Sequence, residues 1–317
     1  MPKYRNKLPQ LGNREFLTDG GLETWMVFQE GLDLPAFAAF TLLNSKKGRA
    51  ALDRYMMNFG RIAVRHQLGF IMDTPTWRAS SRWADDLGVS VQDLKEIHKQ
   101  AIMYLLSLRE WLETDTSPFV LNGVLGPQDD GYNPRHLMTV SEARGYHAQQ
   151  IDWFFEFATD MVSAITMTYV EEALGIALAA KQRGMPSVIS FTLETDGHLP
   201  SGQSLGDAIR QVDLETGEAP AYYMINCAHP DHFVDVLKGR GHWVQRIGGV
   251  RANASRLSHE ELDNAEELDD GNPEELASQY LELRRLLPQA TVLGGCCGTD
   301  HRHIGAIAVT CNCCHAH

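Results

Sequence analysis

Short β-rich runs alternate with longer amphipathic stretches along the whole chain, and this alternation constrains its fold more than any other feature. The clearest amphipathic stretch carries apolar residues at steps of three or four from Leu94 to Leu112, which places them on one face of a helix. Eight strand-then-helix units of about 35–40 residues predict a single (β/α)8 TIM barrel of the α/β class. We expect the strands at residues 15–19, 70–74, 119–125, 161–166, 187–192, 222–227, 243–250 and 291–295. We expect the helices at residues 49–68, 94–112, 141–158, 170–183, 204–212, 231–239, 273–286 and 300–309.

The same alternation also fits a doubly wound open sheet. The number of units and their spread over the whole chain favour the closed barrel instead. No Gly/Ser-rich or Pro-rich linker divides the sequence, so we assign residues 1–317 to one domain. We interpret its Cys/His-rich tail, residues 310–317, as a flexible end, with adventitious metal binding as the alternative.

The charge balance excludes several classes of partner. The chain has 41 acidic and 28 basic residues, and a net charge of -13 disfavours nonspecific nucleic-acid binding and docking on anionic membranes. No apolar run approaches the roughly 18–20 residues of a membrane-spanning helix. No apolar stretch follows the basic amino terminus, so we expect a cytoplasmic protein that acts on small molecules. The sequence sets no number of subunits.

Three of the six cysteines lie where predicted strands end. Cys227 ends the sixth strand, and Cys296 and Cys297 follow the eighth. In a barrel the carboxyl ends of all strands open on one face, and one strand separates the sixth from the eighth, so the three thiols can converge. The glycines of the GGCCG segment permit the sharp turn that would aim both neighbouring cysteines inward.

Three converging thiolates are suited to a catalytic zinc ion. They leave one position of a tetrahedral zinc open, and an incoming thiol in that position would lose its proton. Its sulfur would stay electron-rich, which suits attack on a carbon attached to a sulfonium or quaternary ammonium group. The alternative is three buried free cysteines, which are common small core residues. The spacing of the cysteines alone leaves both interpretations open.

Six segments resemble the successive motifs of the homocysteine S-methyltransferase family. They are LTDGGLET (17–24), TPTWRAS (74–80), VLGP (124–127), SFTLETDGHLPSGQSL (190–205), INCAHP (225–230) and VLGGCCGT (292–299). The similarity spans residues 12–309, and its most specific part is an NC strand end paired with a later GGCCGT.

The resemblance implies a (β/α)8 barrel with zinc bound by Cys227, Cys296 and Cys297. It also implies methyl transfer from a small sulfonium or ammonium donor to the thiol of homocysteine, forming methionine. Donors in the family include S-methylmethionine, S-adenosylmethionine and betaine; methylfolate is used through a separate module, which we do not expect here. By position, Asp19 and Gly20 match residues that hold the amino-acid end of the thiol substrate, as does Thr74. A carboxylate can bind an ammonium, while a backbone N–H and a hydroxyl can bind a carboxylate.

Ile165 departs from the family pattern. Many members have a glutamate after the fourth strand that binds the ammonium of the substrate, and Ile165 aligns with it. Isoleucine cannot pair with an ammonium, and the loss of a charged hydrogen bond costs about 1.5–3 kcal/mol. Three interpretations follow: another acid compensates, the acceptor is a thiol without an amino group, or the barrel has lost catalysis and binds a metal or small ligand.

Two polar segments lie outside these motifs. DDGYNP, residues 129–134, follows the third strand, and we expect it to overhang the barrel mouth. Residues 260–275 carry acids and no Lys or Arg. We interpret them as a solvated loop before the last barrel unit, with an acidic docking patch as the alternative.

Overall fold

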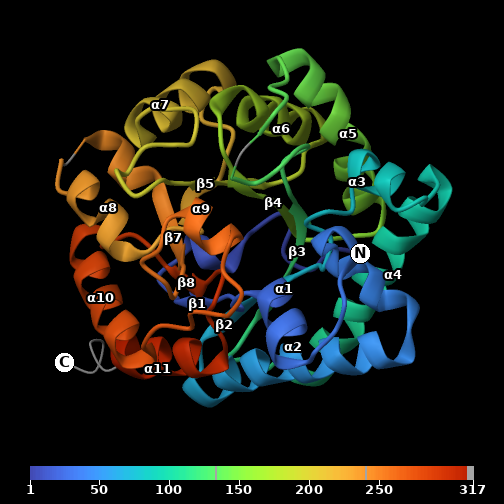
Figure 1. The fold of residues 1–317 in the computed structure, drawn as a ribbon, viewed down its shortest axis with the longest axis horizontal. Helices are drawn as coiled ribbons and strands as arrows, with labels where there is room; N and C mark the ends of the chain where they lie inside the picture. Colours follow the sequence, from blue (N-terminus) through green and yellow to red (C-terminus); the bar gives the residue numbers. More distant parts are fainter. Residues whose placement is uncertain (133, 240, 313–317) are drawn as a thin grey trace.

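The computed structural model describes residues 1–132, 134–239 and 241–312. Within them, eight parallel strands pair in sequence order, and β1 also pairs with β8, so the sheet closes into a barrel (Figure 1). This confirms the predicted (β/α)8 barrel and excludes the open sheet. The strands are β1 (Phe16–Leu17), β2 (Gly69–Asp73), β3 (Phe119–Leu125), β4 (Met161–Met167), β5 (Ser187–Thr192), β6 (Tyr222–Asn226), β7 (Ile247–Ala252) and β8 (Val292–Gly295).

Helices surround the barrel (Figure 1). The longer ones are α2 (Lys46–His66), α4 (Val91–Leu112), α5 (Val140–Glu156), α6 (Val170–Arg183), α7 (Leu205–Thr216), α8 (Pro230–Leu237), α10 (Pro273–Leu286) and α11 (His301–Asn312). Short helices lie in the connections: α1 (Leu22–Thr24), α3 (Ser81–Asp86) and α9 (His259–Asp263). Further short segments of 3-10 or π-helix are η1 (Pro9–Leu11), η2 (Trp25–Gln29), η3 (Pro35–Phe37), η4 (Ala39–Asn44) and η5 (His242–Arg246). No helix of the described ranges is both long and apolar enough to cross a membrane.

Helix α4 shows how the apolar periodicity becomes structure. The hydroxyl of Ser90 accepts a hydrogen bond from the backbone N–H of Asp93 at 3.1 Å and caps the first turn. The predicted apolar face is buried, from Leu94 through Leu105 to Leu112. Burial of this face, rather than intrinsic propensity, provides most of the stability of such a helix.

The interior of the barrel changes from apolar to polar along the strands. Its amino-terminal part is filled by Phe16, Ile71, Val120, Met161 and Val292 with their apolar neighbours. Toward the carboxyl ends, the buried side chains are polar or charged: Asp19, Asp73, Asn122, Ser163, Ser190, Asn226 and Arg251. Buried polar groups need partners, so this end of the barrel is where a binding site is expected.

The structure corrects one predicted strand and part of the tail. Residues 243–250 were predicted as a strand, but η5 occupies their first half and β7 begins at Ile247, where pairing with β6 starts. The apolar pattern of that half reflects burial of Trp243 and Val244, not strand pairing. Of the tail, residues 310–312 belong to α11, and residues 313–317 lie outside the described residues. The assignment of residues 1–317 to one domain stays a prediction.

Candidate active site and metal centre

A cavity of about 450 Å³ opens at the carboxyl ends of the strands, where active sites of such barrels form. Its wall includes residues from the ends of β2, β4, β6, β7 and β8 and from the connections after β1, β3 and β7. The predicted overhang of the DDGYNP loop is confirmed for Asp130, Gly131 and Tyr132, which line this cavity.

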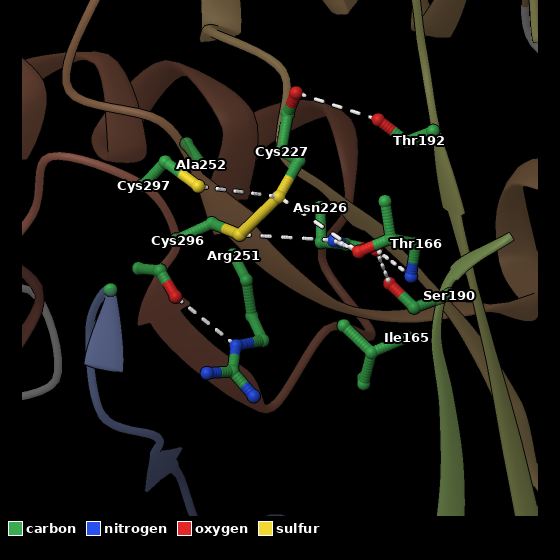
Figure 2. Close-up of a disulfide and its surroundings, with 12 residues drawn as sticks. Ile165, Thr166, Ser190, Thr192, Asn226, Cys227, Arg251, Ala252, Cys296 and Cys297 are labelled. Atoms are coloured by element: carbon green, nitrogen blue, oxygen red, sulfur yellow. Dashed lines mark hydrogen bonds between the residues drawn. A yellow bond between two sulfur atoms is a disulfide. The ribbon is translucent and has the colours of Figure 1, made fainter. Parts of the chain in front are cut away.

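The structure brings the three predicted cysteines together at this cavity. The sulfur atoms of Cys227, Cys296 and Cys297 all lie within 4.8 Å of one another. Cys227 and Cys296 are joined as a disulfide, with Cα atoms 5.4 Å apart, and the Cys297 sulfur lies 4.0 Å from that of Cys227 (Figure 2). Residues 69 positions apart in the chain therefore meet because of the barrel topology.

The donor set fits a zinc ion. Zn–S bonds of about 2.3 Å in a tetrahedron place two sulfur atoms about 3.8 Å apart, close to the 4.0 Å between the sulfurs of Cys227 and Cys297. The ligand form of cysteine is the thiolate, so the Cys227–Cys296 disulfide must be reduced before these sulfurs can bind a metal. Both Cys296 and Cys297 are partly exposed to the cavity, which leaves a side of the cluster accessible to a ligand.

Two glycine-rich turns, DGG after β1 and GGCCGT after β8, hold the cysteine pair in place. The N–H of Gly21 donates to the carbonyl of Thr299 at 3.0 Å, and Gly295 donates to the carbonyl of Asp19 at 2.9 Å. A Cβ atom on Gly20 would lie 2.5 Å from the Thr299 carbonyl oxygen, so this approach requires glycine. Gly298, with φ of 77°, supplies the left-handed residue of the cysteine turn.

Asn226 organises the other side of the sulfur cluster. Its amide oxygen accepts hydrogen bonds from the N–H of Thr166 at 3.0 Å and the hydroxyl of Ser190 at 2.6 Å, and its amide nitrogen donates to the Thr166 hydroxyl at 2.8 Å (Figure 2). Thr166 and Cys227 have φ values of 67° and 52°, which are unfavourable for residues with a Cβ. Such strain persists where the surroundings fix it, and it concentrates at functional sites.

A family model described as Homocysteine S-methyltransferase matches residues 16–311. The chain belongs to the homocysteine S-methyltransferase family. It is therefore a methyltransferase, and the resemblance seen in the sequence motifs is confirmed. None of the curated proteins matches this sequence.

Solved structures of the homocysteine methyltransferase MmuM from Escherichia coli share the fold of this methyltransferase. The oxidized form has a TM-score of 0.75 at 17% identity and covers 96% of this chain and 98% of that chain. The metallated form has a TM-score of 0.74 at 15% identity, with 96% and 99% covered. The apo form has a TM-score of 0.69 at 16% identity, with 97% and 100% covered. At these identities the likeness concerns the fold.

The predicted substrate residues of this methyltransferase differ in their access to the cavity. Gly20 and Thr74 line it. Asp19 is buried beneath it, and its carboxylate accepts a hydrogen bond from Arg251 at 2.5 Å. Arg251 also pairs with Asp73, so one guanidinium holds two carboxylates inside the barrel. Binding of the substrate ammonium by Asp19 stays a prediction, and its carboxylate already has a cationic partner.

Ile165 lies at the cavity, as expected for a residue predicted to align with a substrate-binding glutamate. It is 7% exposed and lines the cavity, and its carbonyl accepts a hydrogen bond from the Trp77 indole N–H at 3.1 Å. The residue that we predict to align with the family's acid thus presents an apolar side chain to the cavity.

Tyr132 is a residue of the site that the motifs did not identify. Its hydroxyl oxygen lies 3.4 Å from the Cys297 sulfur, and its ring stacks on His259 with centroids 4.0 Å apart. His259 in turn donates to the carbonyl of Cys227 at 2.7 Å. Burial raises the pKa of Tyr132 well above its usual value, so its hydroxyl is protonated at neutral pH. The loop was predicted, but its contact with the sulfur cluster depends on the packing of α9.

The acidic segment 260–275 is not simply a solvated loop. Leu262, Asp263, Ala265, Glu267, Leu268 and Asp269 line the cavity. Helix α9 and the residues after it thus form one wall of the cavity. In the cavity lining as a whole, six carboxylates face two arginines, Arg78 and Arg251, so the site carries an excess of negative charge.

Proposed function

We propose that this protein is a zinc-dependent S-methyltransferase that transfers a methyl group from a small sulfonium or ammonium donor to the thiol of homocysteine, forming methionine. The observation that carries the proposal is the convergence of three cysteine sulfurs within 4.8 Å at the cavity. The metallated form of the E. coli homocysteine methyltransferase MmuM, which is similar in fold, supports it.

Cys227, Cys296 and Cys297 would hold the zinc ion as thiolates. When bound, zinc would lower the pKa of the acceptor thiol, so that its sulfur is nucleophilic at neutral pH. The Asn226 amide nitrogen lies 3.8 Å from the Cys296 sulfur, where it can donate to the thiolate and fix its direction. Two thiolates next to each other need the close turn that Gly298 provides.

The negative charge of the cavity suits a cationic methyl donor. Six carboxylates against two guanidiniums attract a sulfonium or quaternary ammonium. In the transfer, the acceptor sulfur forms a bond to the methyl carbon as the bond from that carbon to the donor heteroatom breaks. The donor leaves as a neutral thioether or amine, and the attraction that held the cation is lost, which favours release.

The amino-acid end of the acceptor would lie toward the DGG turn. We propose that Gly20 and Thr74 contact its carboxylate, since both line the cavity. The Thr74 hydroxyl already accepts from the N–H of Val124 at 2.9 Å, so its position is fixed. We propose that Asp19 also contributes to binding of the amino-acid end, through its pairing with Arg251. We place the reaction in the cytoplasm, where reducing conditions keep such thiols free.

An acceptor thiol without an amino group is the second candidate. Ile165 favours it, because the side chain at the family position for the ammonium-binding acid is apolar and faces the cavity.

Methyl transfer tests the proposal directly. The reduced, zinc-loaded protein is incubated with homocysteine and with S-methylmethionine, S-adenosylmethionine or betaine in turn, and methionine is quantified. We expect methionine from at least one donor, and its loss in Cys297→Ser. The matched control is Cys311→Ser, which removes a buried cysteine of α11 outside the cavity. Absence of methionine with all three donors, despite bound zinc, would contradict the proposal.

A further inference from the structure

Glu23 is an acid of the cavity for which the fold provides no cation. It lies on α1, directly after the DGG turn, and lines the cavity together with the three cysteines. Within the described ranges, no Lys, Arg or His pairs with its carboxylate, and the hydrogen-bond donor to it is its own backbone N–H. A carboxylate held in a cavity without a partner is costly unless a ligand supplies the partner.

The two arginines of the cavity are engaged elsewhere. Arg78 donates to the carbonyl of Ala36 at 2.7 Å, and its guanidinium lies 4.0 Å from the ring centroid of Trp83. Arg251 is shared between Asp19 and Asp73. Burial raises the pKa of Glu23 to about 6, and the two arginines oppose this rise only at longer range, so the carboxylate is mostly ionised at neutral pH and has no cation in contact.

Glu23 lies close to the sulfur cluster. Two residues earlier, a Cβ atom on Gly21 would be 2.8 Å from the Cys296 carbonyl oxygen and 3.1 Å from the Cys297 Cα, so α1 begins against the cysteine turn. Glu23 and Cys297 line the same cavity. In homocysteine three carbon atoms separate sulfur from nitrogen. With its sulfur at the cysteine cluster, homocysteine would therefore place its ammonium group near the residues that line the cavity around the cluster.

The other five carboxylates of the cavity are less suited to an ammonium, and one of them, Glu267, is exposed to solvent. Asp73 pairs with Arg251, Asp130 lies 3.4 Å from Arg78 and accepts from the N–H of Tyr132, and Asp269 accepts from the hydroxyl of Ser255. Asp263 is the strongest rival, because it also lines the cavity, but its side chain is exposed to solvent, whereas that of Glu23 is partly buried.

We propose that Glu23 binds the ammonium group of the acceptor and thereby selects amino-acid thiols, in place of the acid that Ile165 replaces. The inference rests on the proposed function, since it takes the three cysteines as the site of the acceptor sulfur. The acceptor is then a thiol that carries an ammonium group. Glu23 would supply the carboxylate that Ile165 lacks, so the apolar residue at position 165 requires no change of substrate.

Calorimetric binding of two thiols tests Glu23. L-Homocysteine and 4-mercaptobutyrate share the thiol, the carboxylate and the carbon chain, and they differ in the ammonium. Both are titrated into the reduced, zinc-loaded protein without a methyl donor. We expect wild type to bind homocysteine about 10- to 100-fold more tightly, the range for a charged hydrogen bond. In Glu23→Gln this preference should fall to nearly one, with the affinity for 4-mercaptobutyrate within about twofold of wild type.

Asp263→Asn is the matched variant, because it neutralises the rival acid of the same cavity. It should retain most of the preference. The proposal is overturned if wild type binds both thiols equally or binds neither, if Glu23→Gln keeps the preference, or if Asp263→Asn abolishes it. The wild-type comparison needs no variant, so it stands even where a substitution impairs folding. If the protein forms methionine but its preference for homocysteine over 4-mercaptobutyrate does not depend on Glu23, this inference alone is refuted. If that preference depends on Glu23 but no methionine forms, the proposed function alone is refuted.

Discussion

The side chain of Asn226 forms a reciprocal pair of hydrogen bonds with the backbone N–H and the hydroxyl of Thr166 across the barrel. Thr166 N–H donates to the amide oxygen of Asn226 at 3.0 Å, and the Asn226 amide donates back to the Thr166 hydroxyl at 2.8 Å. Thr166 and Cys227, the residue after Asn226, both have a left-handed backbone conformation. The asparagine of the NC motif therefore shapes the site from two strands at once.

Replacing Asn226 with alanine should damage the site more than the rest of the fold. It leaves the buried N–H of Thr166 without an acceptor, which costs about 1–3 kcal/mol of stability. We expect a lower free energy of urea unfolding together with a loss of zinc affinity. Asn272→Ala is the control, because Asn272 also accepts a backbone N–H, at the exposed start of α10, and its loss costs about 1 kcal/mol. Equal zinc affinity in wild type and Asn226→Ala would show that the pair does not position the cysteines.

A methyl group on Gly20 should displace the cysteine turn. The added Cβ would lie 2.5 Å from the Thr299 carbonyl oxygen, and such overpacking costs about 1–3 kcal/mol. We expect Gly20→Ala to lower the melting temperature and to weaken zinc binding. Gly145→Ala, within α5, meets nothing within 4 Å and should stabilise the protein by about 0.5–1 kcal/mol. The account is wrong about the contact between the two turns if Gly20→Ala behaves like Gly145→Ala.

The redox state of the site should be visible in a thiol count. Reduction of the Cys227–Cys296 disulfide releases two thiols, and zinc binding then protects them together with Cys297. We expect colourimetric titration of unfolded, metal-free protein to find two more thiols per chain after reduction than before. In Cys227→Ser, Cys296 has lost its partner, so reduction should add none. The same increment in both proteins would place the disulfide elsewhere.

Acid should destabilise the protein partly through His98. This ring is buried between α4 and α5, its Nδ1 lies 2.8 Å from the Leu94 carbonyl oxygen, and burial lowers its pKa to about 4. The unfolded chain, with an ordinary histidine pKa of about 6.5, binds the proton first as the pH falls. The contribution of His98 is therefore complete above pH 6.5 and is lost progressively toward pH 4, by up to about 3 kcal/mol.

Urea unfolding at several pH values checks this sign. The free energy of unfolding should depend less on pH between about 6.5 and 4 in His98→Gln than in wild type. His136→Gln, at an exposed histidine, should keep the wild-type slope. Identical slopes for wild type and His98→Gln would remove His98 as a source of the acid sensitivity.

The repeating elements of the fold were predictable because each has a periodicity of its own. Helices α6 and α10 begin and end at the predicted residues, and β3 and β5 do as well. The meeting of Cys227 with Cys296 and Cys297 was predictable from topology, since all strand ends of a barrel share one face.

The cavity wall was less accessible to sequence reasoning. Tyr132 lies in a loop whose position was predicted, but its approach to Cys297 follows from stacking on His259, which is distant in the sequence. The acidic residues after α9 have no periodicity that separates a solvated loop from a cavity wall. Glu23 lies within the LTDGGLET motif. Its proposed role in binding an ammonium follows from the ion pairs that the other carboxylates of the cavity form, and these are visible only in the structure.

Zinc content tests the central claim most directly. Reduced protein is loaded with zinc, freed of unbound metal and measured by elemental analysis. We predict one zinc ion per chain in wild type and in Cys311→Ser, and almost none in Cys227→Ser or Cys296→Ser. A wild-type protein that retains no zinc, or a triple serine variant of Cys227, Cys296 and Cys297 that retains it, would contradict the account.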